Sequence, residues 1–243
     1  MISIGIPALD KSLMEELPEG LVILVTGSPG SGSELFAKQF ASAATGKENM
    51  VYFTTTERDE DVTSTMEHFG WKSDIQIVNI GERYYDRVLA RELEISRYRQ
   101  EGLKTKDIRR YEMGEEEMRK QVNFLTSLTY EISKLKPPFR IVIDSMDFFL
   151  EYYQDRNVLS ALRTIKSHVQ HNRSVALLTM LTDVHDTRTE SGVEEIVDVI
   201  IELERQRTGD EFKRYLLIRK VRNHPEKTGI LPYTISKEGI TPL

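Results

Sequence analysis

The stretch that decides the fold is Gly27-Ser28-Pro29-Gly30-Ser31-Gly32-Ser33-Glu34, a glycine-rich loop between an apolar run and an amphipathic segment. Its glycines follow the G-x-x-x-x-G-K-[ST] spacing of a phosphate-binding loop, in which backbone N–H groups and a helix N-terminus cradle phosphates. Ser33 stands where that pattern has lysine, and Glu34 where it has serine or threonine. The sequence therefore keeps the cradle and lacks the two side chains that reach the phosphates and Mg²⁺.

Apolar, β-rich runs alternate with helical patterns on both sides of the loop. This alternation predicts an α/β fold with a mostly parallel, twisted sheet flanked by helices. The expected strands are Leu21–Thr26, Met50–Thr55, Ile75–Ile80, Arg140–Asp144 and Ser174–Thr179, then C-terminal β-hairpin strands at Val197–Leu203, Tyr215–Val221 and Tyr233–Ser236. The expected helices lie around 35–41, at Glu57–Phe69, at Glu115–Lys136 and around 158–169.

The composition narrows the class of protein. The chain has 243 residues, 39% of them apolar, a formal net charge of −6 and no cysteine. We expect one domain, 1–243. The negative charge argues against nucleic acid as a partner, and the lack of cysteine excludes disulfides and thiolate metal sites. No run approaches the roughly 20 apolar residues of a membrane span, and no signal peptide is evident, so we expect a soluble, cytoplasmic protein.

A charged helical insertion is expected at about 82–114. Arg83, Arg87 and Arg91 recur at four-residue spacing, which could present a stripe to phosphates or to an acidic partner. Acidic residues are interleaved with them, so a solvated helix face is the favoured interpretation. We expect the aromatic and apolar positions of the insertion to pack against the core; they are Tyr85, Val88 and Leu89.

A second motif strengthens the reading of the loop. Ile141-Val142-Ile143-Asp144-Ser145 is an apolar strand that ends in a carboxylate. An isolated aspartate at such a place is usually a turn residue. Because a phosphate-binding loop precedes it, Asp144 is better interpreted as descended from an aspartate that holds the Mg²⁺ of a nucleotide.

Taken in order, these motifs resemble the KaiC-like branch of the RecA-superfamily ATPases, over nearly the full length of the chain. The matching stretches are 5–10, 17–20, the loop, 69–71, 143–145, 192–200 and 214–224. The resemblance implies a RecA-like P-loop NTPase core that assembles into rings, usually hexamers, with ATP bound between neighbouring subunits.

The resemblance also assigns roles to particular residues. The Lys-x-Arg pair of the family falls on Lys220 and Arg222, which would face the phosphates of a neighbour, with His224 nearby. On a strand the pair shares one face, although a solvated edge-strand pair would look the same. The paired catalytic glutamates of the family fall on Thr56 and Glu57, of which only Glu57 is acidic; the plain alternative is an acidic residue in the first turn of a helix.

The departures from the family pattern weigh against turnover. A missing lysine removes charge-assisted contacts worth about 1.5–3 kcal/mol each. Glu34 adds a carboxylate at a helix N-terminus, where it repels phosphate, and we expect it to pair with Lys38 four residues later. The alternative is that Lys38, or a lysine from another segment, replaces the missing one.

The sequence therefore predicts a KaiC-like, RecA-fold pseudo-ATPase with an impaired nucleotide site, acting as a regulatory or scaffold subunit in signalling or regulation. ATP and Mg²⁺ are possible but weak cofactors. Two alternatives stay open, a weak but genuine ATPase of the KaiC type and a recombinase-paralogue-like DNA-binding accessory factor. The expected partner is a second copy in a homo-oligomeric ring, or a competent paralogue in a hetero-oligomer.

Overall fold

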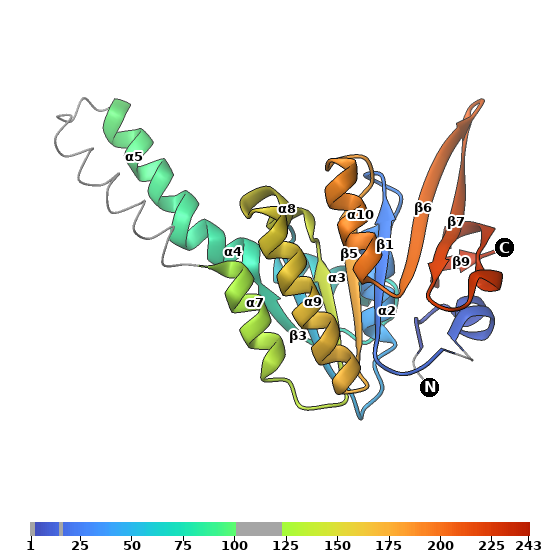
Figure 1. The fold of residues 1–243 in the computed structure, drawn as a ribbon. Helices are drawn as coiled ribbons and strands as arrows, with labels where there is room; N and C mark the ends of the chain where they lie inside the picture. The colour runs from blue at the N-terminus through green and yellow to red at the C-terminus, as the bar shows by residue number, and fades with distance from the viewer. Residues whose placement is uncertain (1–2, 15–16, 101–122) are drawn as a thin grey trace.

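A mixed β-sheet organises the chain in the computed structural model, which describes residues 3–14, 17–100 and 123–243. The nine strands lie in the order β3-β2-β4-β5-β1-β6-β7-β8-β9 (Figure 1). Neighbours from β3 to β6 are parallel, and those from β6 to β9 are antiparallel. The predicted α/β class, with a mostly parallel sheet and C-terminal hairpin strands, is confirmed.

The strands follow the apolar runs of the sequence, because a strand covered by helices on both faces must be apolar throughout. Their bounds are β1 Leu21–Gly27, β2 Asn49–Thr54, β3 Gln76–Asn79, β4 Phe139–Asp144, β5 Val175–Leu181, β6 Val199–Thr208, β7 Glu211–Val221, β8 Gly229–Ser236 and β9 Gly239–Pro242. The hairpin of β6 and β7 extends well past its predicted ends, and β9 was not predicted.

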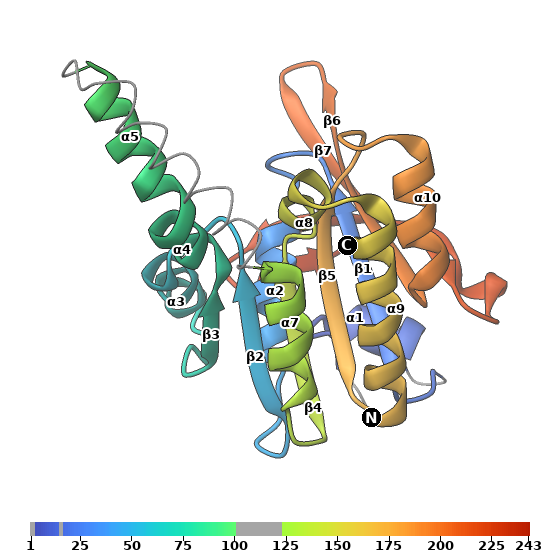
Figure 2. The ribbon, with the colours of Figure 1, turned by 60° about the vertical axis from the view of Figure 1, so that its left-hand side comes forward.

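Helices cover both faces of the sheet (Figure 2). One face packs against α7 Phe124–Ser133, α8 Asp147–Tyr152, α9 Asp155–His171 and α10 Thr187–Ile196. The other packs against α1 Pro7–Leu9, α2 Ser33–Ser42 and α3 Asp59–His68. The predicted helix at Glu115–Lys136 is seen as α7, while its residues up to 122 lie outside the described residues.

The charged insertion begins with α4 Ile80–Tyr84, a π-helical turn at Tyr85–Leu89 and α5 Ala90–Gln100, which projects away from the sheet (Figures 1 and 2). Residues 101–114 of it lie outside the described residues. Val88 is buried as expected, but the expectation for Tyr85 is wrong, because its side chain is 49% exposed. Tyr84 packs inward instead, 5.4 Å from the ring of Phe148.

The last strands fold back over α2 and tie both ends of the described chain to it. Gln39 on α2 accepts a hydrogen bond from the Ile240 N–H at 2.8 Å and donates one to the Gly5 carbonyl at 3.0 Å. Ile240 is buried in the same core cluster as Ile4 and Phe40. Among the described residues, the structure has no helix with the length and apolarity to cross a membrane.

Candidate functional site

The glycine loop joins the end of β1 to the start of α2, at the edge where the parallel strands have their carboxyl ends. Gly30 and Gly32 adopt positive φ angles of 79° and 101°, which favour glycine. The Tyr233 hydroxyl of β8 donates to the Ser31 carbonyl at 2.6 Å. This hydrogen bond ties the backbone of the loop to the C-terminal strands.

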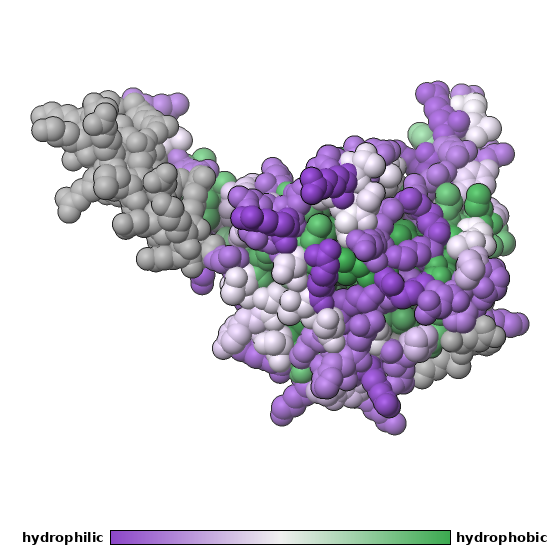
Figure 3. Space-filling model, viewed as in Figure 1, coloured by the Kyte–Doolittle hydropathy of each residue, from purple (hydrophilic) through white to green (hydrophobic). Residues whose placement is uncertain are grey.

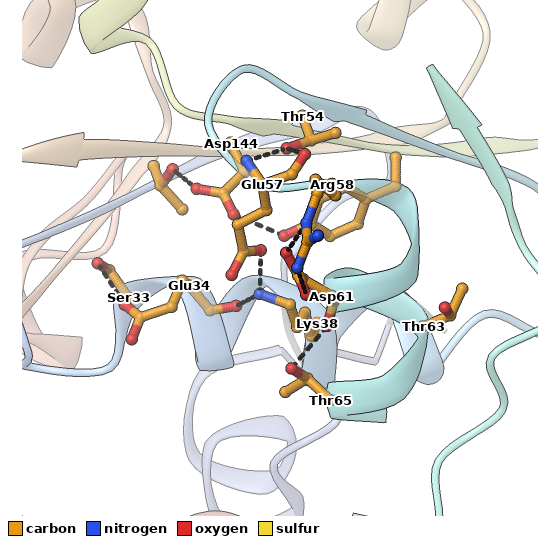
Figure 4. A network of polar contacts seen from close by, with 12 residues as sticks. Ser33, Glu34, Lys38, Thr54, Glu57, Arg58, Asp61, Thr63, Thr65 and Asp144 are labelled. Carbon is orange, nitrogen blue, oxygen red and sulfur yellow. Dashed lines mark hydrogen bonds and ion pairs between the residues drawn. The ribbon is translucent and has the colours of Figure 1, made fainter. Parts of the chain in front are cut away.

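Ser33 and Glu34 form the first turn of α2, beside the loop (Figure 4). The Ser33 hydroxyl donates to Glu34 Oε2 at 3.5 Å. Glu34 is exposed, and its carboxylate lies where the partial positive charge of the helix favours an anion. The chain thus supplies its own negative charge at the helix start.

Lys38 forms a buried ion pair with Glu57, not with the side chain of Glu34. Its side chain is 1% exposed, and Nζ donates to Glu57 Oε2 at 2.5 Å and to the Glu34 carbonyl at 3.4 Å (Figure 4). The expected Glu34–Lys38 side-chain pair is wrong, because Lys38 faces the sheet and Glu34 faces solvent. The pair joins α2 to the segment that follows β2.

Asp144 ends β4 and is 6% exposed. Its Oδ2 accepts from the Tyr52 hydroxyl and its Oδ1 from the Thr179 hydroxyl, both at 2.6 Å. Burial, and then the charge of Asp144, raise the pKa of Tyr52 well above its usual range. Both carboxylate oxygens therefore accept hydrogen bonds from neighbouring strands. Sequence reasoning missed Tyr52 and Thr179; the only signal was a polar group inside an apolar strand run.

A cavity of about 1110 Å³ opens beside these residues, over the carboxyl ends of β2, β4 and β5. Five of its lining carboxylates are exposed and have no ion-pair partner among the described residues: Glu34, Asp59, Glu60, Glu82 and Glu151. Arg58 also lines the cavity, but it pairs with Asp61 at 2.8 Å. Over the described ranges, no group of three or more His, Asp or Glu side chains is arranged to hold a metal ion.

Lys220 and Arg222 lie together at the end of β7, at the opposite edge of the sheet from the loop. Lys220 donates to backbone carbonyls at the end of α10, including that of Val197 at 2.9 Å. Arg222 donates to the buried Asp198 at 2.7 Å and to carbonyls of the same turn. Burial, with the charges of neighbouring cations, lowers the pKa of Lys220. His224 contacts Glu226 at 3.0 Å.

The family description "ATPase: KaiC" matches residues 2–242. The chain belongs to this KaiC-like ATPase family. A circadian clock oscillator protein KaiC from Parathermosynechococcus lividus is 26% identical over 230 residues, covering 92% of the chain but 39% of that relative. A UPF0273 protein of Thermotoga maritima is also 26% identical, over 98% of the chain and 94% of its own length. The chain therefore spans about two fifths of the length of the KaiC relative and nearly all of the UPF0273 relative.

The fold has a solved counterpart. The crystal structure of a KaiC-like protein from Pyrococcus horikoshii OT3 superposes with a TM-score of 0.69, at 24% identity, over 100% of this chain and 98% of that one. At this identity the likeness speaks for the fold. Together with the family match over residues 2–242, this fold confirms the KaiC-like branch that the sequence motifs indicated.

Proposed function

We propose that this KaiC-like protein is a pseudo-ATPase, a cytoplasmic regulatory or scaffold subunit whose nucleotide site no longer supports turnover. The observation that carries the proposal is that the side chains of the site are engaged with one another. Glu57, the candidate catalytic glutamate, neutralises Lys38, and Asp144 accepts short hydrogen bonds through both oxygens.

The residues present fit a phosphate but do not fit a complex of nucleotide and Mg²⁺. The backbone of the loop and the start of α2 are arranged as an anion cradle. Ser33 carries no charge for the β- and γ-phosphates, and Glu34 replaces a neutral hydroxyl with a carboxylate that repels them. Lys38 does not substitute for the missing lysine, because its ammonium is buried against Glu57.

The same contacts hold the site in shape without a ligand. The Lys38–Glu57 pair fixes α2 against the end of β2, and Tyr52 and Thr179 fix Asp144 between β2 and β5. A buried charge with a partner persists in one geometry, because separating the pair leaves an unsolvated ion. A site whose charged and polar side chains already have partners within the chain suits a structural subunit.

For its partners, we propose assembly into a ring of its own copies or with a competent paralogue. Lys220 and Arg222 would face the neighbouring subunit, with His224 beside them. In the single chain both cations already donate hydrogen bonds to backbone carbonyls at the end of α10, so an anion from a neighbour would have to compete with those carbonyls. This competition favours a contact that does not depend on nucleotide.

The test is ATP turnover and binding of Mg-ATP by isothermal titration. We expect negligible turnover and weak or no binding. The double variant Ser33→Lys with Glu34→Thr should recover binding, since each change contributes on the order of 1–3 kcal/mol, together enough for micromolar affinity. Ser33→Lys alone should recover less, because the new lysine still faces Glu34.

Asp144→Ala in the double-variant background is the matched control, and it should lose the Mg²⁺-dependent part of the binding. Clear turnover by the unmodified protein that disappears with Asp144→Ala would refute the proposal and favour the weak ATPase. No binding by the double variant would mean that the loop now serves only the fold.

A further inference from the structure

The outer part of the β6–β7 hairpin, residues 204–214, stands clear of the body as a largely hydrophilic projection (Figure 3). Side chains alternate along a strand, so Ile201 and Leu203 share one face of β6, and both are buried in the core cluster that contains α2. Arg205 and Arg207 are the next two positions on that face, and both are exposed. The row of apolar side chains therefore gives way to arginines where the hairpin leaves the body.

The partner strand β7 brings two more side chains to the same face. Arg205 directly opposes Arg214, and Arg207 opposes Phe212. Directly opposed residues of an antiparallel pair lie on one face of the sheet. These four residues form what we call the arginine face. It carries three positive charges and no negative one.

The opposite face of the hairpin has the reverse charge. It carries Glu204, Glu211 and Lys213, for a net charge of −1. The whole chain has a formal net charge of −6, and on that ground the sequence argued against nucleic acid as a partner. The arginine face is a local exception to this charge, because the strand register separates the arginines from the carboxylates.

The arginines of this face have no internal counter-ion. Within the part of the chain that the structure describes, none of the three forms an ion pair with a carboxylate. The Nε of Arg214 is buried and has no hydrogen-bond partner among the described residues. Like charges placed directly opposite each other destabilise a strand pair, and Arg205 and Arg214 are placed in this way. A negative group from outside the chain would stabilise both guanidinium groups.

The arginine face also carries an exposed aromatic ring. The side chain of Phe212 is 53% exposed, and the Arg205 guanidinium lies 4.6 Å from the centre of its ring. Nucleobases stack on aromatic rings and on arginine planes in sites that bind single strands. An acidic peptide would pair with the arginines and make no use of the ring. The combination therefore favours a ligand that has both phosphates and bases.

The spacing of the arginines suits an extended strand of phosphates. Arg205 and Arg207 are two positions apart on β6, which is about 7 Å along the strand. Arg214 lies about 5 Å across the hairpin from Arg205. Successive phosphates of an extended single strand are separated by a similar distance. A duplex keeps its bases stacked inside, away from Phe212, so the single strand fits better.

The arginine face borders the glycine loop without being part of it. A Cβ added to Gly30 would be 3.2 Å from Nη1 of Arg205, so the two surfaces are in contact. At the loop, the exposed carboxylate of Glu34 repels a phosphate. An anionic strand held by the arginines therefore crosses the hairpin toward its tip and leaves the loop empty.

We propose that the arginine face binds single-stranded nucleic acid, with phosphates paired to Arg205, Arg207 and Arg214 and a base stacked on Phe212. Contacts to phosphates and to the flat faces of bases carry no sequence information, so the binding is independent of sequence. This site goes beyond the scaffold role and does not rest on it. ATP turnover tests the role, whereas oligonucleotide binding without nucleotide tests the arginine face.

The test is fluorescence anisotropy of a labelled single strand of about 20 thymidine nucleotides, mixed with the full chain in EDTA at several salt concentrations. We expect a dissociation constant of about 1–100 μM at low salt, the range of binding without sequence specificity. Three phosphate contacts should give a slope of about −2 in a plot of log affinity against log salt, because each contact contributes about −0.7.

Variants separate the charges from the ring. Arg205→Ala with Arg214→Ala should weaken binding at least tenfold and reduce the slope to about −0.7. Phe212→Ala should weaken binding about tenfold and leave the slope unchanged, since it removes stacking and no charge. Lys213→Ala is the matched control, because it removes one positive charge from the opposite face, and it should bind as the unmodified protein does. Circular dichroism of each variant checks that the fold is retained.

Four results would overturn the proposal. They are no binding by the unmodified protein at low salt, a Lys213→Ala variant as weak as the double arginine variant, release of the oligonucleotide by Mg-ATP, and equal competition by a polyglutamate peptide of the same charge. Release by Mg-ATP would place the strand in the glycine loop, and equal competition by the peptide would assign the face to an acidic protein.

Discussion

Removing Glu57 should destabilise the protein more than removing its buried partner Lys38. In Glu57→Ala, the ammonium of Lys38 keeps one acceptor, the Glu34 carbonyl at 3.4 Å, in a position where its side chain is 1% exposed. Breaking a buried pair in this way costs about 3–5 kcal/mol. The Glu57 side chain is 29% exposed, so its loss lets some water reach the ammonium, and we expect about 2–3 kcal/mol.

The reverse change leaves a charge that water can reach. Lys38→Met keeps an unbranched apolar stem in the core, and the remaining carboxylate stays partly hydrated, so we expect a loss of about 1 kcal/mol. The double variant should resemble Lys38→Met, which gives a coupling of about 2–3 kcal/mol in a double-mutant cycle. Glu57→Gln, which keeps an acceptor and removes the charge, should fall between the two single variants.

Urea unfolding measures these differences, followed by circular dichroism and by the fluorescence of Trp71, the single tryptophan of the chain. Coincident transitions by the two probes establish that one free energy describes the unfolding. A glutamate retained only for catalysis would be neutral or stabilising to remove. The reasoning fails if Glu57→Ala changes the free energy of unfolding by less than about 0.5 kcal/mol, or if Lys38→Met is the more damaging change.

Two further changes test contacts around the site. Because the pKa of Tyr52 is raised, the folded state keeps the phenol proton above pH 10, whereas the unfolded state loses it. The contribution of Tyr52 to stability is therefore full below pH 10 and falls as the pH rises further. Tyr52→Phe should flatten this fall in urea unfolding at pH 9 to 11, and an unchanged slope would contradict the assignment. Gly239→Ala should lower the free energy of unfolding by about 1–3 kcal/mol, because Gly239 has a φ of +99° and the new methyl group would overlap the Trp71 ring. The same overlap should shift the fluorescence emission of Trp71. Unchanged emission and stability would refute this packing.

The sequence predicted the features that follow from the order of residues along the chain. Apolar runs located the parallel strands, and the glycine loop and Asp144 fell at strand ends, as the motifs required. Contacts that depend on register were missed. Tyr52 and Thr179 meet at Asp144 only because β2 and β5 flank β4. The four-residue spacing predicted that Lys38 pairs with Glu34 along the helix. This prediction failed because spacing does not show which face of a helix is buried. The outer part of the β6–β7 hairpin, residues 204–214, carries polar side chains on both faces except at Phe212, so no apolar alternation marked its length.

The fold of the last strands over α2 has a consequence for the protein during synthesis. The phosphate-type loop is made early, but Tyr233, which fixes Ser31, follows it by 202 positions, and Ile240, which meets Gln39, follows that residue by 201. On the ribosome, α2 and the loop therefore leave the exit tunnel long before their binding partners exist. Until the C-terminal strands emerge, the apolar side of α2 that they cover is open to chaperones. A ribosome that stalls before residue 233 would hold a chain whose glycine-rich loop is already synthesised but lacks the hydrogen bond from Tyr233 to Ser31.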